Sequence, residues 1–212
     1  MPSVPPEILT LVSIGLIQLL AVISPGPSFL ITARTAVAQS RMEGIKVATG
    51  LALGTVVWSA GALFGLNVLF HAVPALFLAM KFAGALFLMW IAFQIFRHAA
   101  VPIAIEQGEN GGQGSSVWKG FWVQMANPKV IVFFGSVFIA MLPANPPLWL
   151  MLALIAVVSF NEFWWYSLVS LFFGAGPVRR FYLAAKTWID RVTGLFLGAL
   201  GLRLLWGLRE VA

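Results

Sequence analysis

The chain has no cysteine among its 212 residues and very little charge. The absence of thiols excludes disulfides, thiolate metal sites, iron–sulfur clusters and cysteine nucleophiles. Charged residues make up 9% of the chain, against about 25% in an average globular protein, and 60% of the residues are hydrophobic. A soluble fold has more surface than so few charges can cover, and disorder requires low hydrophobicity. The composition therefore predicts a polytopic membrane protein and not an enzyme.

Long apolar runs divide the chain into expected membrane helices, since a spanning helix needs about 20 mostly apolar residues. Six such helices are expected, at 8–33, 47–71, 75–97, 117–142, 148–173 and 189–209. Residues 106–116, which separate the third from the fourth, are rich in Gly, Gln and Ser, as flexible linkers are. The expected fold is all-α, with a first three-helix repeat at 1–100, a Gly-rich cytoplasmic linker at 101–117 and a second three-helix repeat at 118–212.

The first expected helix is interrupted by Pro25-Gly26-Pro27. Proline lacks an N–H, so Pro25 and Pro27 free the carbonyls of Ala21 and Ile23, and glycine permits a sharp bend between them. A freed carbonyl is costly in lipid unless protein or water satisfies it. A packing kink is the alternative, but two prolines around a glycine favour a functional break.

The fourth expected helix is interrupted by Asn127-Pro128-Lys129. Asn is a favoured N-cap and Pro a favoured first helical residue, so the helix should restart here, and Pro128 frees the carbonyl of Gln124. Lys129 then lies in a first turn, about 15 Å deeper than Lys119, where the helix dipole disfavours a cation. It needs an anionic partner, unless it extends to the lipid headgroups.

Glu162 is the acidic residue expected inside an apolar helix. The other six are expected in loops or near chain ends: Glu7, Glu43, Glu106, Glu109, Asp190 and Glu210. A carboxyl group inside the membrane is a functional hypothesis by default. Exclusion of water favours its neutral form, as proton exchange requires, whereas a nearby Lys129 opposes this. Three roles stay open: ion coupling, a structural pair with Lys129, and a protonated Glu that donates to a neighbour.

Basic residues concentrate in the odd-numbered loops of this layout. Nine of the 13 lie there: Arg34, Arg41, Lys46, Arg97, Lys119, Arg179, Arg180, Lys186 and Arg191. Cytoplasmic loops carry the excess of Lys and Arg in membrane proteins. The odd loops are therefore expected in the cytoplasm and both termini outside.

An odd number of helices in each half turns the second half upside down relative to the first. The prolines of the two breaks, Pro25 and Pro128, lie at corresponding places, and residues 81–84 (Lys-Phe-Ala-Gly) are similar to 191–194 (Arg-Val-Thr-Gly). Inverted repeats with paired broken helices indicate a secondary transporter with its binding site near the middle of the membrane.

These motifs together resemble the LysE/RhtB family of bacterial amino-acid exporters over nearly the whole chain. Pro25-Gly26-Pro27 resembles the Pro-Gly-Pro-Asn element of the family, with Ser28 where Asn is usual, and Asn127-Pro128-Lys129 resembles its Asn-Pro-Lys element. Other segments similar to the family are 41–44 with Gly50 and Gly54, 81–85, Phe133 with Phe134, and 191–194 with Gly198 and Gly201. The resemblance implies export of amino acids or related metabolites across the inner membrane, usually coupled to the proton gradient.

An amino acid is a zwitterion, and the expected site contains groups for both charges. Its carboxylate suits the helix start at Ser28 or the ammonium of Lys129, and its ammonium suits the freed carbonyls or Glu162. The candidate substrate-binding residues are Pro25, Gly26, Pro27, Ser28, Gln124, Asn127, Pro128 and Lys129, with Glu162 as the candidate ion-coupling residue. The expected partners are an amino acid, protons and the lipid bilayer. No metal, cofactor or nucleic acid is expected, and a homo-oligomer is left open.

Two other functions are weighed against amino-acid export. A cation exporter of related architecture would require several carboxylates or histidines in the membrane, and the sequence offers one such Glu. A non-transporting subunit of a membrane assembly would not need the two broken helices. No Gly-x-x-x-x-Gly-Lys-Ser/Thr motif is present, so coupling to an ion gradient is favoured over direct use of ATP.

Overall fold

The computed structural model describes residues 5–72, 74–101, 115–143, 145–173 and 176–209. Eight α-helices and no strands occur in these ranges. The helices are α1 (Pro6–Ile23), α2 (Pro27–Ala38), α3 (Arg41–Ala72), α4 (Pro74–Arg97), α5 (Ser116–Met125), α6 (Pro128–Met141), α7 (Leu148–Phe172) and α8 (Gly176–Arg209). The all-α prediction is confirmed for the described residues. Most of the expected linker, 102–114, lies outside them.

Several helices are long and apolar enough to cross a membrane. Among the described residues they are α1, the segment 41–65 of α3, and α7. A fourth crossing segment is formed if α5 and α6, bent by 55° at their break, are taken as one span. Together with the large apolar side chains on the outer surface, these helices support the predicted polytopic membrane protein.

Two expected helix boundaries are wrong. The last helix begins at Gly176 and not near 189, so Lys186 and Asp190 lie inside α8. The second expected helix, now α3, begins at Arg41 and not near 47. The physical reason is the same in both cases: charged residues mark where a helix leaves the lipid, but the backbone hydrogen bonds can continue beyond that point.

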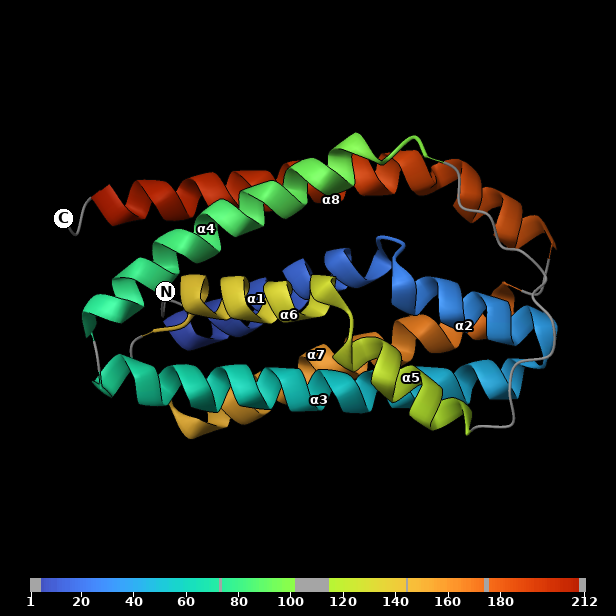
Figure 1. Cartoon of the computed structure of the whole chain (residues 1–212), viewed down its shortest axis with the longest axis horizontal. Helices are drawn as coiled ribbons and strands as arrows, with labels where there is room; N and C mark the ends of the chain where they lie inside the picture. The colour runs from blue at the N-terminus through green and yellow to red at the C-terminus, as the bar shows by residue number, and fades with distance from the viewer. Residues whose placement is uncertain (1–4, 73, 102–114, 144, 174–175, 210–212) are drawn as a thin grey trace.

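Figure 1 shows the broken helices between two pairs of unbroken ones. Helices α4 and α8 pack together along the top of the view, and α3 packs on α7 along the bottom, with α1, α2 and α6 between them. Helix α5 lies against α3. The two breaks, between α1 and α2 and between α5 and α6, are therefore enclosed by the rest of the bundle.

The contact between α3 and α5 depends on glycine. A Cβ atom on Gly50 would collide with the carbonyl oxygen of Val117, and one on Gly120 would collide with that of Val47. The two backbones therefore touch directly, as small residues allow in membrane helices. Gln124, one turn beyond Gly120, is fully buried as a result.

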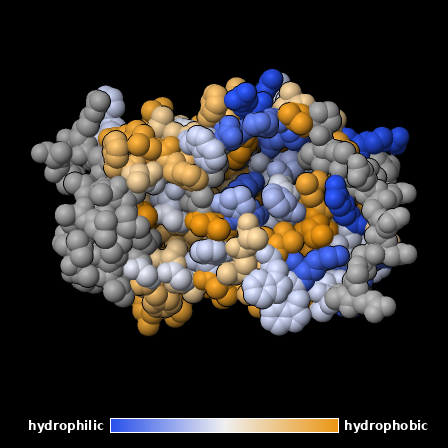
Figure 2. Space-filling model, in the orientation of Figure 1, coloured by the Kyte–Doolittle hydropathy of each residue, from blue (hydrophilic) through white to orange (hydrophobic). Residues whose placement is uncertain are grey.

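Basic residues gather at one end of the bundle, where α2 and α4 end and α3, α5 and α8 begin. They include Arg34, Arg41, Lys46, Arg97, Lys119 and Arg180. Figure 2 shows a strongly hydrophilic surface toward this end, on the right. The start of α1 and the end of α8 lie toward the opposite end (Figure 1).

Candidate functional site

The first break has the position that the prolines predict. Helix α1 ends at Ile23, Gly26 is extended with φ −155° and ψ −165°, and α2 begins at Pro27. The carbonyl of Ile23, expected to be open, accepts a hydrogen bond from the Tyr182 hydroxyl at 2.7 Å. A tertiary contact that the sequence does not reveal therefore occupies this carbonyl.

The second break is a capped restart, as predicted. Helix α5 ends at Met125, and the side-chain oxygen of Asn127 accepts from the backbone N–H of Lys129 at 3.0 Å. Pro128 is the first residue of α6. The carbonyl of Gln124 accepts from the N–H of Asn127 at 3.2 Å within the turn, so it too has a protein donor.

A chain of hydrogen bonds joins the two breaks. The Asn127 amide donates to the Ser28 hydroxyl at 2.9 Å, and this hydroxyl donates to Gln124 Oε1 at 2.7 Å. The Nε2 of Gln124 then donates to Glu162 Oε1 at 2.8 Å and to the Thr55 hydroxyl at 2.7 Å. Ser28, Gln124, Asn127 and Glu162, expected to form one site, are thus brought together.

The second oxygen of Glu162 has its own amide partner. Gln18 Nε2 donates to Glu162 Oε2 at 3.1 Å, and the Asn161 amide donates to Gln18 Oε1 at 2.9 Å. Gln18 and Asn161 were not among the predicted site residues. An amide side chain within an expected membrane helix was the available signal, but it does not distinguish a site residue from a contact between helices.

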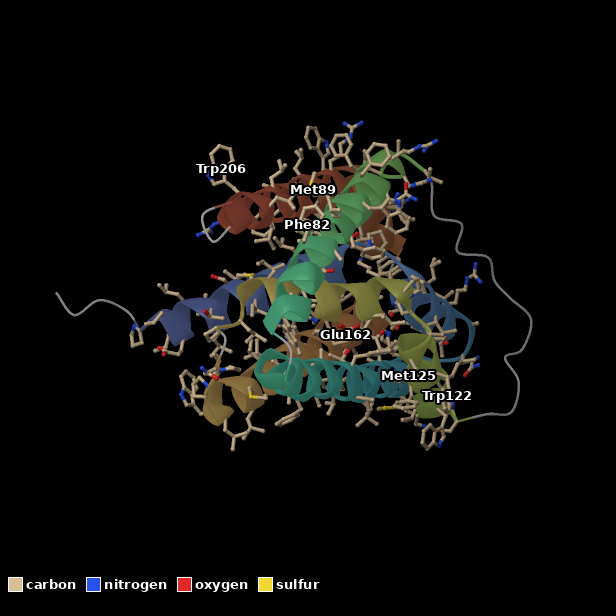
Figure 3. The ribbon with its side chains drawn as sticks, turned by 60° about the vertical axis from the view of Figure 1, so that its left-hand side comes forward. Phe82, Met89, Trp122, Met125, Glu162 and Trp206 are labelled. Atoms are coloured by element: carbon tan, nitrogen blue, oxygen red, sulfur yellow. The ribbon has the colours of Figure 1, made fainter. Side chains whose placement is uncertain are left out.

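Both oxygens of Glu162 therefore accept from amide N–H groups, and the residue is only 4% exposed. This arrangement fits the charged carboxylate, which accepts at both oxygens. Protonation would remove the charge that strengthens both of these hydrogen bonds. Figure 3 shows Glu162 in the interior of the bundle, whereas Trp122 and Trp206 lie on its outside.

Lys129 is close to the first break and not in a salt bridge. Its Nζ donates to the carbonyl oxygen of Ser24 at 2.8 Å. The salt bridges found among the described residues are Lys46–Glu43 and Lys186–Asp190, so the direct Glu162–Lys129 pair considered from the sequence is not formed. The ammonium group turns toward the interior and not to the headgroups.

A cavity of about 30 Å³ lies between the two breaks. Its lining comes from α1, α2, α6 and α7 and the turns between them: Gln18, Ala21, Val22, Gly26, Ser28, Asn127, Lys129, Val130, Phe133, Phe134, Glu162 and Tyr166. Five of the predicted residues, Gly26, Ser28, Asn127, Lys129 and Glu162, thus share one cavity. Pro27 and Pro128 start the adjoining helices, and Pro25 lies within the break.

The two helix starts at this cavity differ in their caps. Asn127 caps α6 with its side chain, whereas no side chain caps α2. The first turn of a helix leaves N–H groups without acceptors in the helix, so the start of α2, at Ser28 and Phe29, retains donors and the positive end of its dipole.

Asp190 was expected near a helix end, and this expectation is wrong. It lies within α8, is 5% exposed, and accepts from the Ser24 hydroxyl at 2.8 Å. Its other oxygen lies 3.0 Å from Lys186 Nζ. Asp190 was not among the predicted site residues because the last helix was expected to start near it, whereas α8 starts at Gly176.

Residues 19–207 match the sequence model of a protein family described as LysE type translocator. The chain belongs to the LysE type translocator family. This confirms the resemblance seen in the motifs. The translocator is therefore a multi-pass membrane transport protein and not an enzyme, and family membership argues against a non-transporting assembly subunit.

The translocator is similar to bacterial proteins named as efflux proteins. It is 30% identical over 197 residues to the threonine efflux protein of Escherichia coli (strain K12), covering 91% of this chain and 96% of that protein. The threonine efflux protein of Salmonella typhi is 28% identical over the same shares of both chains. A shorter match, 25% identical over 125 residues, is to the leucine efflux protein of Klebsiella pneumoniae. It covers 58% of this chain and 59% of that protein. No solved structure matches the chain.

Proposed function

We propose that this translocator exports neutral amino acids, or closely related metabolites, from the cytoplasm of a bacterium by proton antiport. The observation that carries the proposal is the cavity between the two helix breaks, which contains both the Lys129 ammonium and the Glu162 carboxylate. An amino acid has the complementary pair of charges. The threonine and leucine efflux proteins among its relatives support this class of substrate.

The substrate carboxylate binds between Lys129 and the start of α2. The Lys129 ammonium has three donors, of which one is used on the Ser24 carbonyl. The N–H groups at the uncapped start of α2 add a second set of donors beside Gly26 and Ser28, both of which line the cavity. The start of α6 contributes Lys129 but no free N–H groups, because Asn127 caps it.

The substrate ammonium binds at Glu162, and sharing of this carboxylate with a proton couples export of the substrate to entry of a proton. A proton and an ammonium group compete for the same carboxylate, so the carrier binds one or the other but not both. Proton binding also weakens the hydrogen bonds from Gln18 and Gln124, because a neutral carboxyl group is a poorer acceptor than a carboxylate. Protonation of Glu162 thus favours a different arrangement of α1, α5 and α7.

The architecture that fits this mechanism has six spans in two inverted repeats. In Figure 1, α3 and α7 run in opposite directions, as do α4 and α8, and the broken pairs α1–α2 and α5–α6 are also opposed. We assign residues 1–100 and 118–212 to the two repeats and 101–117 to a cytoplasmic linker. The basic end of the bundle faces the cytoplasm of an inner membrane, and both termini face outward.

The observed cavity, about 30 Å³, suits one or two water molecules and not an amino acid. Substrate entry therefore requires the two breaks to separate, as alternating access around a central site would provide.

Everted membrane vesicles containing the protein test the proposal directly. We expect uptake of radiolabelled L-threonine or L-leucine when the vesicle interior is made acidic, and loss of this uptake when an ionophore dissipates the gradient. Replacement Lys129→Gln should raise the half-saturating concentration by about tenfold or more, since a charge-assisted hydrogen bond is lost. Vesicles without the protein are the control. The absence of gradient-driven uptake of both amino acids would contradict the proposal.

A further inference from the structure

Four polar side chains of α8 form a buried stripe beside the break between α1 and α2. They are Tyr182, Lys186, Asp190 and Thr193, three or four residues apart and therefore on one face of the helix. Their exposed fractions are 8%, 7%, 5% and 1%. Buried polar groups within a membrane protein require partners, and here the partners identify a role.

Three of these side chains contact the end of α1. The Tyr182 hydroxyl donates to the Ile23 carbonyl at 2.7 Å, and the Thr193 hydroxyl lies 3.5 Å from the Leu20 carbonyl. Asp190 Oδ1 accepts from the Ser24 hydroxyl at 2.8 Å. Helix α8 thus contacts the last turn and the C-cap of α1 through three side chains.

Ser24 connects α8 to the cavity, because its hydroxyl and its carbonyl have different partners. The hydroxyl donates to Asp190, and the carbonyl oxygen accepts from Lys129 Nζ at 2.8 Å. Ser24 therefore links the Asp190 carboxylate to the Lys129 ammonium through two hydrogen bonds. Ser24 is 2% exposed, so water does not offer its hydroxyl an alternative acceptor.

Asp190 is itself fixed from the other side. Its Oδ2 lies 3.0 Å from Lys186 Nζ, which also donates to the carbonyls of His98, Ala99 and Val101 at 3.0, 2.9 and 2.9 Å. These carbonyls follow the end of α4. The Asp190 carboxylate therefore cannot turn away from Ser24 without breaking a buried ion pair.

We propose that Asp190 is a positioning residue for the carboxylate end of the substrate: through Ser24 it places the Lys129 ammonium at the cavity. The proposal rests on the proposed function, in which Lys129 binds the substrate carboxylate. It assigns to Asp190 an effect on ligands that carry a carboxylate and none on ligands that lack one.

The variant Ser24→Ala tests this role because it removes the hydroxyl and leaves the carbonyl, Lys129 and all charges in place. In everted vesicles, we expect its half-saturating concentration for L-threonine to rise by about tenfold, the effect of one hydrogen bond to a charged group. The maximal rate should stay within about twofold of wild type, because the loss concerns binding. L-threoninol, which has a CH₂OH group in place of the carboxylate, should inhibit both proteins at the same concentration.

Two further variants separate positioning from a structural effect. Ser24→Thr restores a hydroxyl and should restore the affinity. Thr193→Val removes a hydroxyl of the same stripe that makes no hydrogen bond to the Ser24 side chain or to Lys129, and should keep wild-type affinity. An unchanged half-saturating concentration in Ser24→Ala, an equal rise in Thr193→Val, or an equal loss of threoninol inhibition overturns the positioning role. Wild-type vesicles without amino-acid uptake, or a Lys129→Gln protein with unchanged affinity, overturn the proposed function itself.

Discussion

At the scale of single residues, the environment of a charge determines what it can do. Glu162, in α7, and Asp190, in α8, are both buried carboxyl groups, but their partners differ. Asp190 is paired with a lysine, whereas Glu162 accepts only from neutral amides among the contacts described. A neutral partner permits the carboxylate to gain a proton or an ammonium group, while an ion pair opposes both. Glu162 is therefore the better ion-coupling candidate and Asp190 the better positioning residue.

Replacement Glu162→Gln is expected to abolish uptake driven by an imposed pH gradient. The amide cannot take up a proton, so exchange of internal for external L-threonine should continue at a reduced rate that no longer depends on pH. The measurement is gradient-driven uptake and exchange in the same vesicles.

Glu43→Gln is the matched control, because Glu43 pairs with Lys46 outside the cavity. It should keep both the rate and the pH dependence. Should Glu162→Gln retain wild-type gradient-driven uptake, Glu162 is not the coupling group.

At the scale of helices, the site depends on how closely α3 and α5 approach. Gly50 and Gly120 permit backbone contact, and this contact places Gln124 between Ser28, Thr55 and Glu162. The breaks determine where the helices stop, but the glycine contact determines that the two breaks meet.

Gly50→Ala is expected to destabilise the protein and to reduce export together. The added Cβ would meet the backbone of Val117 and Phe121, and overpacking of this kind costs about 1–3 kcal/mol. The thermal transition of the purified protein in detergent and the uptake of L-threonine are the measurements.

Gly61→Ala, on the same helix, is the control for helix propensity. A Cβ there meets nothing within 4 Å, so this variant should match or exceed wild-type stability and keep export. Equal effects of the two substitutions would show that the close approach of α3 and α5 is not needed.

At the scale of the whole molecule, the charge distribution and the chain ends predict the orientation in the membrane. Basic residues gather at one end, and the start of α1 and the end of α8 lie toward the other (Figures 1 and 2). From the excess of Lys and Arg in cytoplasmic loops, we expect the basic end of this bundle to face the cytoplasm.

The absence of cysteine makes this orientation directly measurable. We expect the variant Ser3→Cys to react with a membrane-impermeant maleimide added outside spheroplasts, and Asn110→Cys to react only after permeabilisation. The cysteine-free wild type gives the background. Labelling of both positions from the same side would contradict both the orientation and the six-span architecture.

The sequence alone determined the properties that depend on local chemistry. Membrane insertion follows from the apolar composition, and the two breaks follow from prolines that lack an N–H and from the Asn127 cap. Five of the proposed site residues could therefore be predicted to line one cavity before any contact was known. Their motifs were also enough to indicate the family.

Only the tertiary structure decided which group meets which. Gln18 reaches Glu162 across 144 positions of the chain, and Asp190 reaches Ser24 across 166. The Lys129 ammonium donates to the Ser24 carbonyl and not to Glu162. The Ile23 carbonyl, which proline leaves without a helical donor, accepts from the Tyr182 hydroxyl. The physical reason is that a proline or a cap acts on its own turn of helix, whereas a buried polar group takes its partner from whichever helix packs against it.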